Sequence, residues 1–178
     1  MAQKIDDRKS ETIEAVCRIV ASKLKGKAAG QADAFVRGFY ANMPPGDIAA
    51  YSAENLYGMA VSCWKFCRRR DVGEPLVRVF NPSPEEHGWK SNHTIIEIVN
   101  DDMPFLVDSV TAELNYLGLT VHLVIHPIFA VDRGADGLLT AIAADADSGG
   151  MRESFMHVEV DEQTDPARLE RLADAIRG

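Results

Sequence analysis

Residues 94–118, with the sequence TIIEIVNDDMPFLVDSVTAELNYLG, decide the fold. The stretch begins with the alternation of a β-strand, because every second residue from Thr94 to Ile98 falls on one side of an extended chain. After the acidic turn, the apolar residues recur at the spacing of a helix, which Gly118 ends. The sequence therefore predicts a strand that turns at once into a helix, with Pro104 in the first helical turn.

Two further strands and a last helix are predicted downstream. Residues 121–131 are expected to form a long strand in which Pro127 marks an edge or a bulge, and residues 153–160 alternate in hydrophobicity. Residues 165–176 carry an apolar stripe at helical spacing. The order strand, helix, strand, strand, helix predicts an α+β fold with a ferredoxin-like antiparallel sheet and both helices on one face. A strand at residues 76–80 either adds to this sheet or replaces a missing strand.

The chain divides into two modules that differ in hydrophobic periodicity and in net charge. Residues 1–73 are expected to form three helices, the first beginning at Ser10, and their net charge is +4, whereas that of residues 74–178 is −12. This shift predicts a helical N-terminal module, 1–73, followed by the α+β domain, 74–178. No following element covers the apolar stripe of the last helix, so we expect the second domain to be truncated at its C-terminal end.

Composition excludes several function classes. The 178 residues are 46% hydrophobic and carry a net charge of −8, which is typical of a globular protein and disfavours binding to nucleic acid or to an anionic membrane. No apolar run is long enough to span a membrane, the first residues do not form a secretory signal, and three cysteines suit a reducing compartment. We therefore expect a cytoplasmic protein without nucleic-acid or membrane partners.

Two segments carry a family resemblance. Residues 74–82, EPLVRVFNP, and residues 101–110, DDMPFLVDSV, are similar to the N-terminal region of the large NAD-specific glutamate dehydrogenases of bacteria, and residues 94–121 resemble the first half of an ACT domain. The likeness covers residues 30–178. It implies a non-catalytic regulatory or assembly module of a long chain, whose catalytic region converts L-glutamate and NAD to 2-oxoglutarate and ammonia. It also implies contacts with other domains of that chain and a homo-oligomer.

The turn between the predicted strand and helix is the candidate ligand site. It is formed by Asn100, Asp101, Asp102, Met103 and Phe105, where backbone amides at a helix start favour a carboxylate and the aspartates favour an ammonium group. The turn therefore suits an amino-acid effector. ACT domains that bind amino acids usually have glycine at the position of Phe105. The alternative role of the two aspartates is to cap the helix.

Neither a catalytic residue nor a cofactor is assigned to this chain. It lacks the Gly-x-Gly-x-x-Gly turn of dinucleotide sites, and Lys90 is the one lysine after residue 73, so by resemblance NAD belongs to the parent enzyme. Two alternatives stay open. One is a purely structural spacer that docks other domains, and the other is a small stand-alone enzyme.

A stand-alone enzyme would use the histidines of the sheet. His122 and His126 share one face of a strand but lie ~13 Å apart, which is too far for one metal ion. His157, with Glu159 nearby, could join either of them in a zinc or iron site. The simpler interpretation places these histidines on the solvent face of the sheet, and no metal site is assigned.

Overall fold

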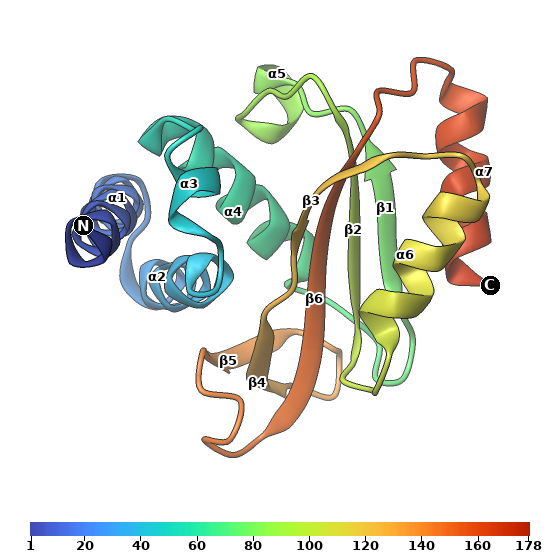
Figure 1. Cartoon of the computed structure of the whole chain (residues 1–178). Coiled ribbons are helices and arrows are strands. Elements are labelled where there is room, and N and C mark those ends of the chain that lie inside the picture. The colour runs from blue at the N-terminus through green and yellow to red at the C-terminus, as the bar shows by residue number, and fades with distance from the viewer.

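The computed structural model describes residues 1–178 and consists of a six-stranded sheet with helices on both faces (Figure 1). The helices are α1 (Ala2–Lys23), α2 (Gly26–Tyr40), α3 (Pro45–Ile48), α4 (Ala53–Cys67), α5 (Pro84–His87), α6 (Leu106–Tyr116) and α7 (Pro166–Arg177). The strands are β1 (Leu76–Phe80), β2 (Thr94–Asp101), β3 (Val121–Ile125), β4 (Ile128–Arg133), β5 (Leu139–Ala143) and β6 (Met151–Val160). The predicted α+β class is confirmed.

The sheet is antiparallel throughout and is built around β6. The strand order is β1-β2-β6-β4-β5, and β3 pairs with β6 beyond the end of β4. The long strand expected over residues 121–131 is divided into β3 and β4, because His126 and Pro127 interrupt it and proline has no N–H to donate. The strand at residues 76–80 adds to the sheet as β1, beside β2.

Helices from different parts of the chain cover the two faces of the sheet. The helices α6 and α7 lie on one face, as predicted for the ferredoxin-like part, and α1 to α4 lie on the other (Figure 1). A core of 25 buried residues joins the N-terminal helices to the sheet and reaches from Val16 to Phe155. The second core, of 10 residues, joins α6 and α7 to the opposite face. The N-terminal helices thus share a continuous core with the strands.

Two helix starts differ from the sequence prediction. The helix α1 begins at Ala2, so Ser10 is an interior residue and not a cap. The helix α6 begins at Leu106, so Pro104 precedes the helix. Phe105 is the N-cap residue of α6 and adopts a left-handed backbone with φ of 63°. It is the one residue other than glycine with positive φ, a conformation that glycine adopts without steric cost.

Candidate functional site

The aspartates of the turn at residues 100–105 form ion pairs with arginines. The Asp101 carboxylate lies 3.0 Å from Nη1 of the buried Arg70, and the Asp102 carboxylate lies 3.1 Å from Nε of Arg152. Neither aspartate caps α6, which begins without a side-chain hydrogen bond. The capping role expected as an alternative is therefore wrong, since the arginines take the carboxylates instead.

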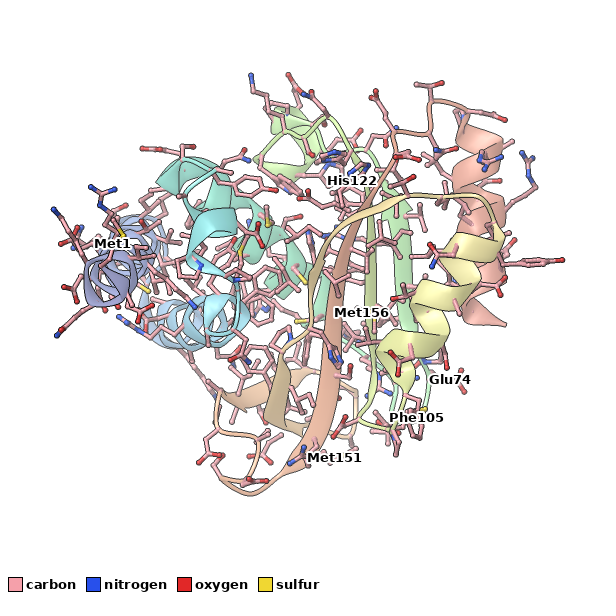
Figure 2. All side chains as sticks on the ribbon, viewed as in Figure 1. Met1, Glu74, Phe105, His122, Met151 and Met156 are labelled. Carbon is pink, nitrogen blue, oxygen red and sulfur yellow. The ribbon has the colours of Figure 1, made fainter.

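The other residues of this turn differ in exposure, since Asn100 is half-buried and Met103 and Phe105 are exposed. Asn100 uses its side-chain oxygen to accept from Nη2 of Arg70 at 3.4 Å and from the backbone N–H of Asp101 at 2.9 Å. Met103 and Phe105 are 47% and 77% exposed. Figure 2 shows Phe105 at one end of the sheet and His122 at the other. The structure thus brings the five predicted residues together, but it displays the phenyl ring to solvent.

A buried ionic cluster lies behind the turn. Oε1 of Glu153 accepts from Nη1 of Arg70 at 2.8 Å and from Nε of Arg133 at 2.8 Å, and its Oε2 accepts from Nη2 of Arg133 at 2.9 Å. The same Arg133 donates to the carbonyl of Cys67, at the end of α4. The charges of all three side chains are enclosed, so each is stabilised by its partners and not by water. The cluster ties the end of α4 to β4, β6 and the turn.

A second polar group lies along the same face of the sheet, at its other end. The hydroxyl of Tyr51, in the loop before α4, lies 3.0 and 3.1 Å from the two carboxylate oxygens of Glu159. Nδ1 of His93 lies 3.3 Å from Oε2 of Glu159, and the His93 ring stacks on that of His122 at 4.6 Å. His122 in turn lies 2.7 Å from Asp161. The group runs from the interior to the surface.

The carboxylates in this second group have shifted pKa values. Burial alone would raise the pKa of Glu159, but the hydrogen bond from Tyr51 and the nearby imidazoles of His157 and His93 outweigh it and hold the pKa below the usual value. Hydrogen bonds from His122 and from the backbone of Thr120 lower the pKa of Asp161. Both carboxyl groups are therefore ionised at neutral pH.

The three histidines singled out in the sequence have separate environments. His122 is partly exposed beside Asp161, His126 hydrogen-bonds Ser154 at 2.6 Å, and His157 is fully buried. The solvent-face placement is therefore wrong for His157, because that face of the sheet is covered by the N-terminal helices. Both ring nitrogens of His157 lack a hydrogen-bond partner, and its Nε2 lies 3.7 Å from Glu159. The structure shows no group of three or more ligating side chains arranged for a metal ion.

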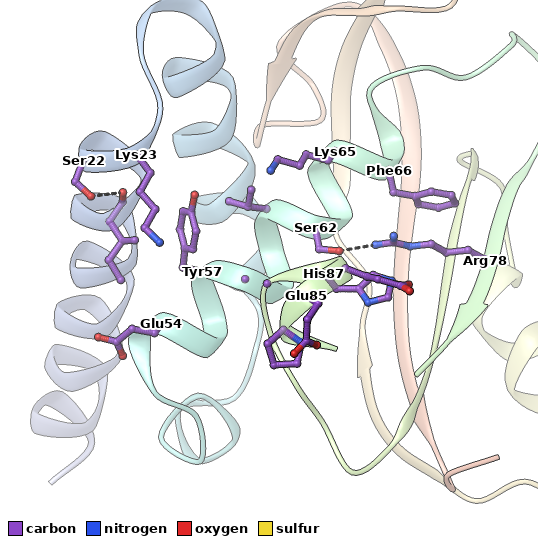
Figure 3. Close-up of a pocket in the computed structure, with 16 residues that line it drawn as sticks. Ser22, Lys23, Glu54, Tyr57, Ser62, Lys65, Phe66, Arg78, Glu85 and His87 are labelled. Atoms are coloured by element: carbon purple, nitrogen blue, oxygen red, sulfur yellow. Dashed lines mark hydrogen bonds and ion pairs between the residues drawn. The ribbon is translucent and has the colours of Figure 1, made fainter. Parts of the chain in front are cut away.

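The main pocket lies apart from the predicted turn. It has a volume of about 780 Å³ and is bounded by α4, α5, the end of α1 and Arg78 of β1 (Figure 3). Nη2 of Arg78 donates to Ser62 at 2.9 Å and to the buried Glu97 at 2.8 Å. The guanidinium lies over the rings of Phe66 and Phe80. This pocket combines cationic, aromatic and hydroxyl groups that the sequence does not bring together.

The sequence prediction missed both the ionic cluster and the pocket. Glu153 begins the polar side of an alternating strand, together with His157 and Glu159, and this polarity gives no sign that the side is buried. Arg70 follows the last helix of the N-terminal module, and no local pattern shows that it reaches a strand 83 residues later. The pocket gathers residues from α1, α4, β1 and α5, so no single stretch of sequence carries its signature.

A family model and two curated relatives that match this chain all bear the name glutamate dehydrogenase. Residues 35–176 match the family described as "Glutamate dehydrogenase, ACT1 domain". The chain is 42% identical to an NAD-specific glutamate dehydrogenase of Halomonas elongata over 153 residues, and 35% identical to one of Pseudomonas aeruginosa over 159 residues. These alignments cover 85% and 88% of this chain but 10% of each relative. No solved structure matches the chain significantly.

No helix in the structure has the length and apolar character needed to cross a membrane.

The family match covers most of the chain, and its description names the ACT domain that the strand and turn at residues 94–105 resemble. The structure supplies the antiparallel sheet with two helices on one face that such a domain requires. The chain belongs to the family of glutamate dehydrogenase ACT1 domains.

Proposed function

We propose that this chain is a non-catalytic assembly or regulatory module of a longer, NAD-dependent glutamate dehydrogenase. The parent reaction converts L-glutamate, NAD and water to 2-oxoglutarate, ammonia and NADH, and it takes place in another part of the polypeptide. The family and the two relatives support this proposal, since the chain spans about a tenth of the length of those glutamate dehydrogenases. The expected setting is the cytoplasm, where glutamate and NAD are both available.

The observation that favours an assembly role is the display of Phe105. A left-handed backbone costs roughly 1–2 kcal/mol for a residue with a side chain, yet the ring remains 77% exposed and gains little from packing within the chain. The half-exposed Met103 lies in the same turn. Arg70 and Arg152 brace this turn through the two aspartates, so the apolar pair is held on a rigid support. Such pre-organised apolar residues are typical anchors of protein interfaces.

The assembly role is tested in the full-length dehydrogenase. We expect Phe105→Ser to lower the thermal midpoint of the assembled enzyme or its oligomeric mass, measured by calorimetry and light scattering. Tyr116→Ser is the matched control, because Tyr116 is also exposed but lies at the far end of α6. Unchanged mass and midpoint in the Phe105 variant would refute the assembly role of this residue.

The non-catalytic role is tested on the isolated chain. We expect no NADH above that of a boiled sample when the purified chain is incubated with L-glutamate and NAD. Glutamate-dependent NADH formation that survives further purification would overturn the proposal and favour the stand-alone enzyme.

A regulatory role through the turn is a separate proposal. Backbone amides at the start of α6 can receive a carboxylate, whereas both aspartates already have arginine partners, which weakens their attraction for an ammonium group. Calorimetric titration of the chain and of Phe105→Gly with a panel of amino acids tests this site. If neither protein shows a heat of binding with any of the amino acids, the proposal that the turn binds an amino acid is wrong.

A further inference from the structure

The pocket between α1, α4 and α5 has a rigid floor. A Cβ atom added to Gly58 would meet the carbonyl oxygen of Gly88 at 2.3 Å, so the absence of a side chain lets α4 and the end of α5 touch. Gly88 itself has φ of 76°, a conformation suited to glycine. The two glycines thus allow close contact between α4 and the end of α5. The pocket beside them has a volume of about 780 Å³, within the size range of small-molecule sites.

Two lysines lie at one end of this pocket. Nζ of Lys23, in the last turn of α1, lies 5.2 Å from the centre of the Tyr57 ring, and Lys65 reaches toward the same region from the last turn of α4 (Figure 3). Neither ammonium group is within ion-pair distance of a carboxylate, although acidic residues line other parts of the pocket. Burial raises the pKa of Tyr57, so its hydroxyl stays protonated and can donate.

Three further donors line the wall nearer the sheet. Oγ of Ser62 accepts from Arg78, which leaves the hydroxyl proton of Ser62 free to donate. Nδ1 of His87 accepts from the backbone N–H of Ser83 at 3.1 Å, and burial lowers the pKa of His87, so its Nε2 carries the proton at neutral pH. Arg78 completes this wall, held between two aromatic rings.

The acidic residues of the pocket lie elsewhere. Glu54 is in the first turn of α4, and Glu85 and Glu86 are in the first turn of α5, where helix dipoles favour negative charge. All three are exposed. In Figure 3 the carboxylates of Glu54 and Glu85 lie away from the ends of Lys23 and Lys65. The pocket is therefore cationic at one end and acidic at the other.

We propose that this pocket binds a small organic anion whose charged group, a phosphate or a carboxylate, lies between Lys23 and Lys65. The donors of Tyr57, Ser62 and His87 bind the polar body of the ligand, and the acidic end excludes molecules that carry a second anionic group there. The site is separate from the turn at residues 100–105, and its occupancy does not depend on the proposed function.

Calorimetric titration of the chain with three named anions tests the proposal. The probes are inorganic phosphate, adenosine monophosphate and gluconate, and adenosine and glucose are the uncharged counterparts of the last two. We expect saturable binding of at least one organic anion, no binding of its counterpart, and weaker binding at higher salt. Binding of adenosine monophosphate alone identifies the phosphate chemistry, and binding of gluconate alone identifies the carboxylate.

Matched variants locate the site. Lys65→Gln and Lys23→Gln should each weaken the binding about tenfold or more, whereas Lys27→Gln, which removes an exposed lysine of α2 outside the pocket, should leave it unchanged. Glu85→Gln should bind equally or more tightly, since it removes a repulsive charge. Thermal unfolding of each variant verifies that it folds.

Three outcomes would overturn the proposal. The first is the absence of binding of all three probes at millimolar concentration. The second is an equal loss in Lys65→Gln and Lys27→Gln, which would indicate non-specific attraction. The third is loss of binding in Glu85→Gln, which would show that the pocket selects a cation or a zwitterion.

Discussion

The two faces of the sheet are built on different principles. The face covered by α6 and α7 is aliphatic, with Ile96, Ile98 and Val158 among its buried residues and without a buried charge. The face covered by α1 to α4 combines aromatic packing with buried ionisable side chains, among them Glu97, Glu153, His157 and Glu159 of the strands. Successive residues of β2 and β6 alternate between these faces, so the same two strands serve both.

The difference indicates how strongly each face fixes the position of the helices that cover it. Aliphatic contacts have little direction, and many arrangements of α6 and α7 would bury the same area. Buried charges must meet particular partners, because an unpaired charge in the interior costs several kcal/mol. The polar face therefore defines one position of the N-terminal helices on the sheet, and this position also sets the walls of the pocket at Arg78.

The largest effect is expected from removing the central charge of the polar face. Glu153→Gln keeps the size of the side chain but leaves Arg133 buried without a carboxylate and Arg70 with Asp101 alone. We expect the free energy of unfolding to fall by about 3–5 kcal/mol in urea denaturation, the usual cost of breaking a buried ion pair. Glu86→Gln, at an exposed glutamate, should change it by less than about 0.5 kcal/mol. Equal effects of the two substitutions would contradict the distinction between buried and exposed charges.

The second largest effect is expected from Glu159, as a loss of the free energy of unfolding at acid pH. Its pKa is lowered in the folded protein, so its ionised form stabilises the fold above the pKa of the unfolded chain, and this contribution is lost as the pH falls through the folded pKa. The free energy of unfolding should therefore decline from pH 6 toward pH 3. Glu159→Gln should make that decline shallower.

The hydrogen bonds of Tyr51 can be tested separately. Tyr51→Phe removes the donor to Glu159 and should cost about 1.5–3 kcal/mol at pH 7, as is usual for a bond to a charged group. The cost should shrink as the pH falls through the lowered pKa of Glu159, because the carboxylate then becomes protonated. A cost that is independent of pH would show that the tyrosine contributes only packing.

A smaller effect is expected on the aliphatic face. Ile96→Val removes one buried methylene group and should lower the free energy of unfolding by about 1 kcal/mol. Since no charge is involved, the loss should be the same at pH 4 and pH 7. A loss that varies with pH would show that the two faces are coupled through the sheet.

The aliphatic face and the two helices that cover it could be predicted from the sequence, whereas the polar face could not. Alternation from Thr94 to Ile98 and the helical stripe beyond it depend on neighbouring residues, so a linear reading finds them. The pairing of Arg70 with Glu153 depends on the packing of α4 against the sheet, and the chain between them gives no local sign of it. The turn lies between β2 and α6, as the sequence predicts, but the arginine partners of its aspartates come from distant segments.

The smallest effect is expected at the start of α6, where the aliphatic face begins. Phe105→Gly relieves a left-handed backbone that costs roughly 1–2 kcal/mol, but it adds about 0.5–1 kcal/mol of entropy cost from the freer unfolded chain. Because the exposed ring contributes little packing, we expect a net stabilisation of about 0.5 kcal/mol in urea denaturation of the isolated chain. Phe105→Ala is the control, since alanine keeps the strain and should not stabilise. If glycine destabilises the isolated chain, the ring packs within it, and its exposure would then not support a docking role.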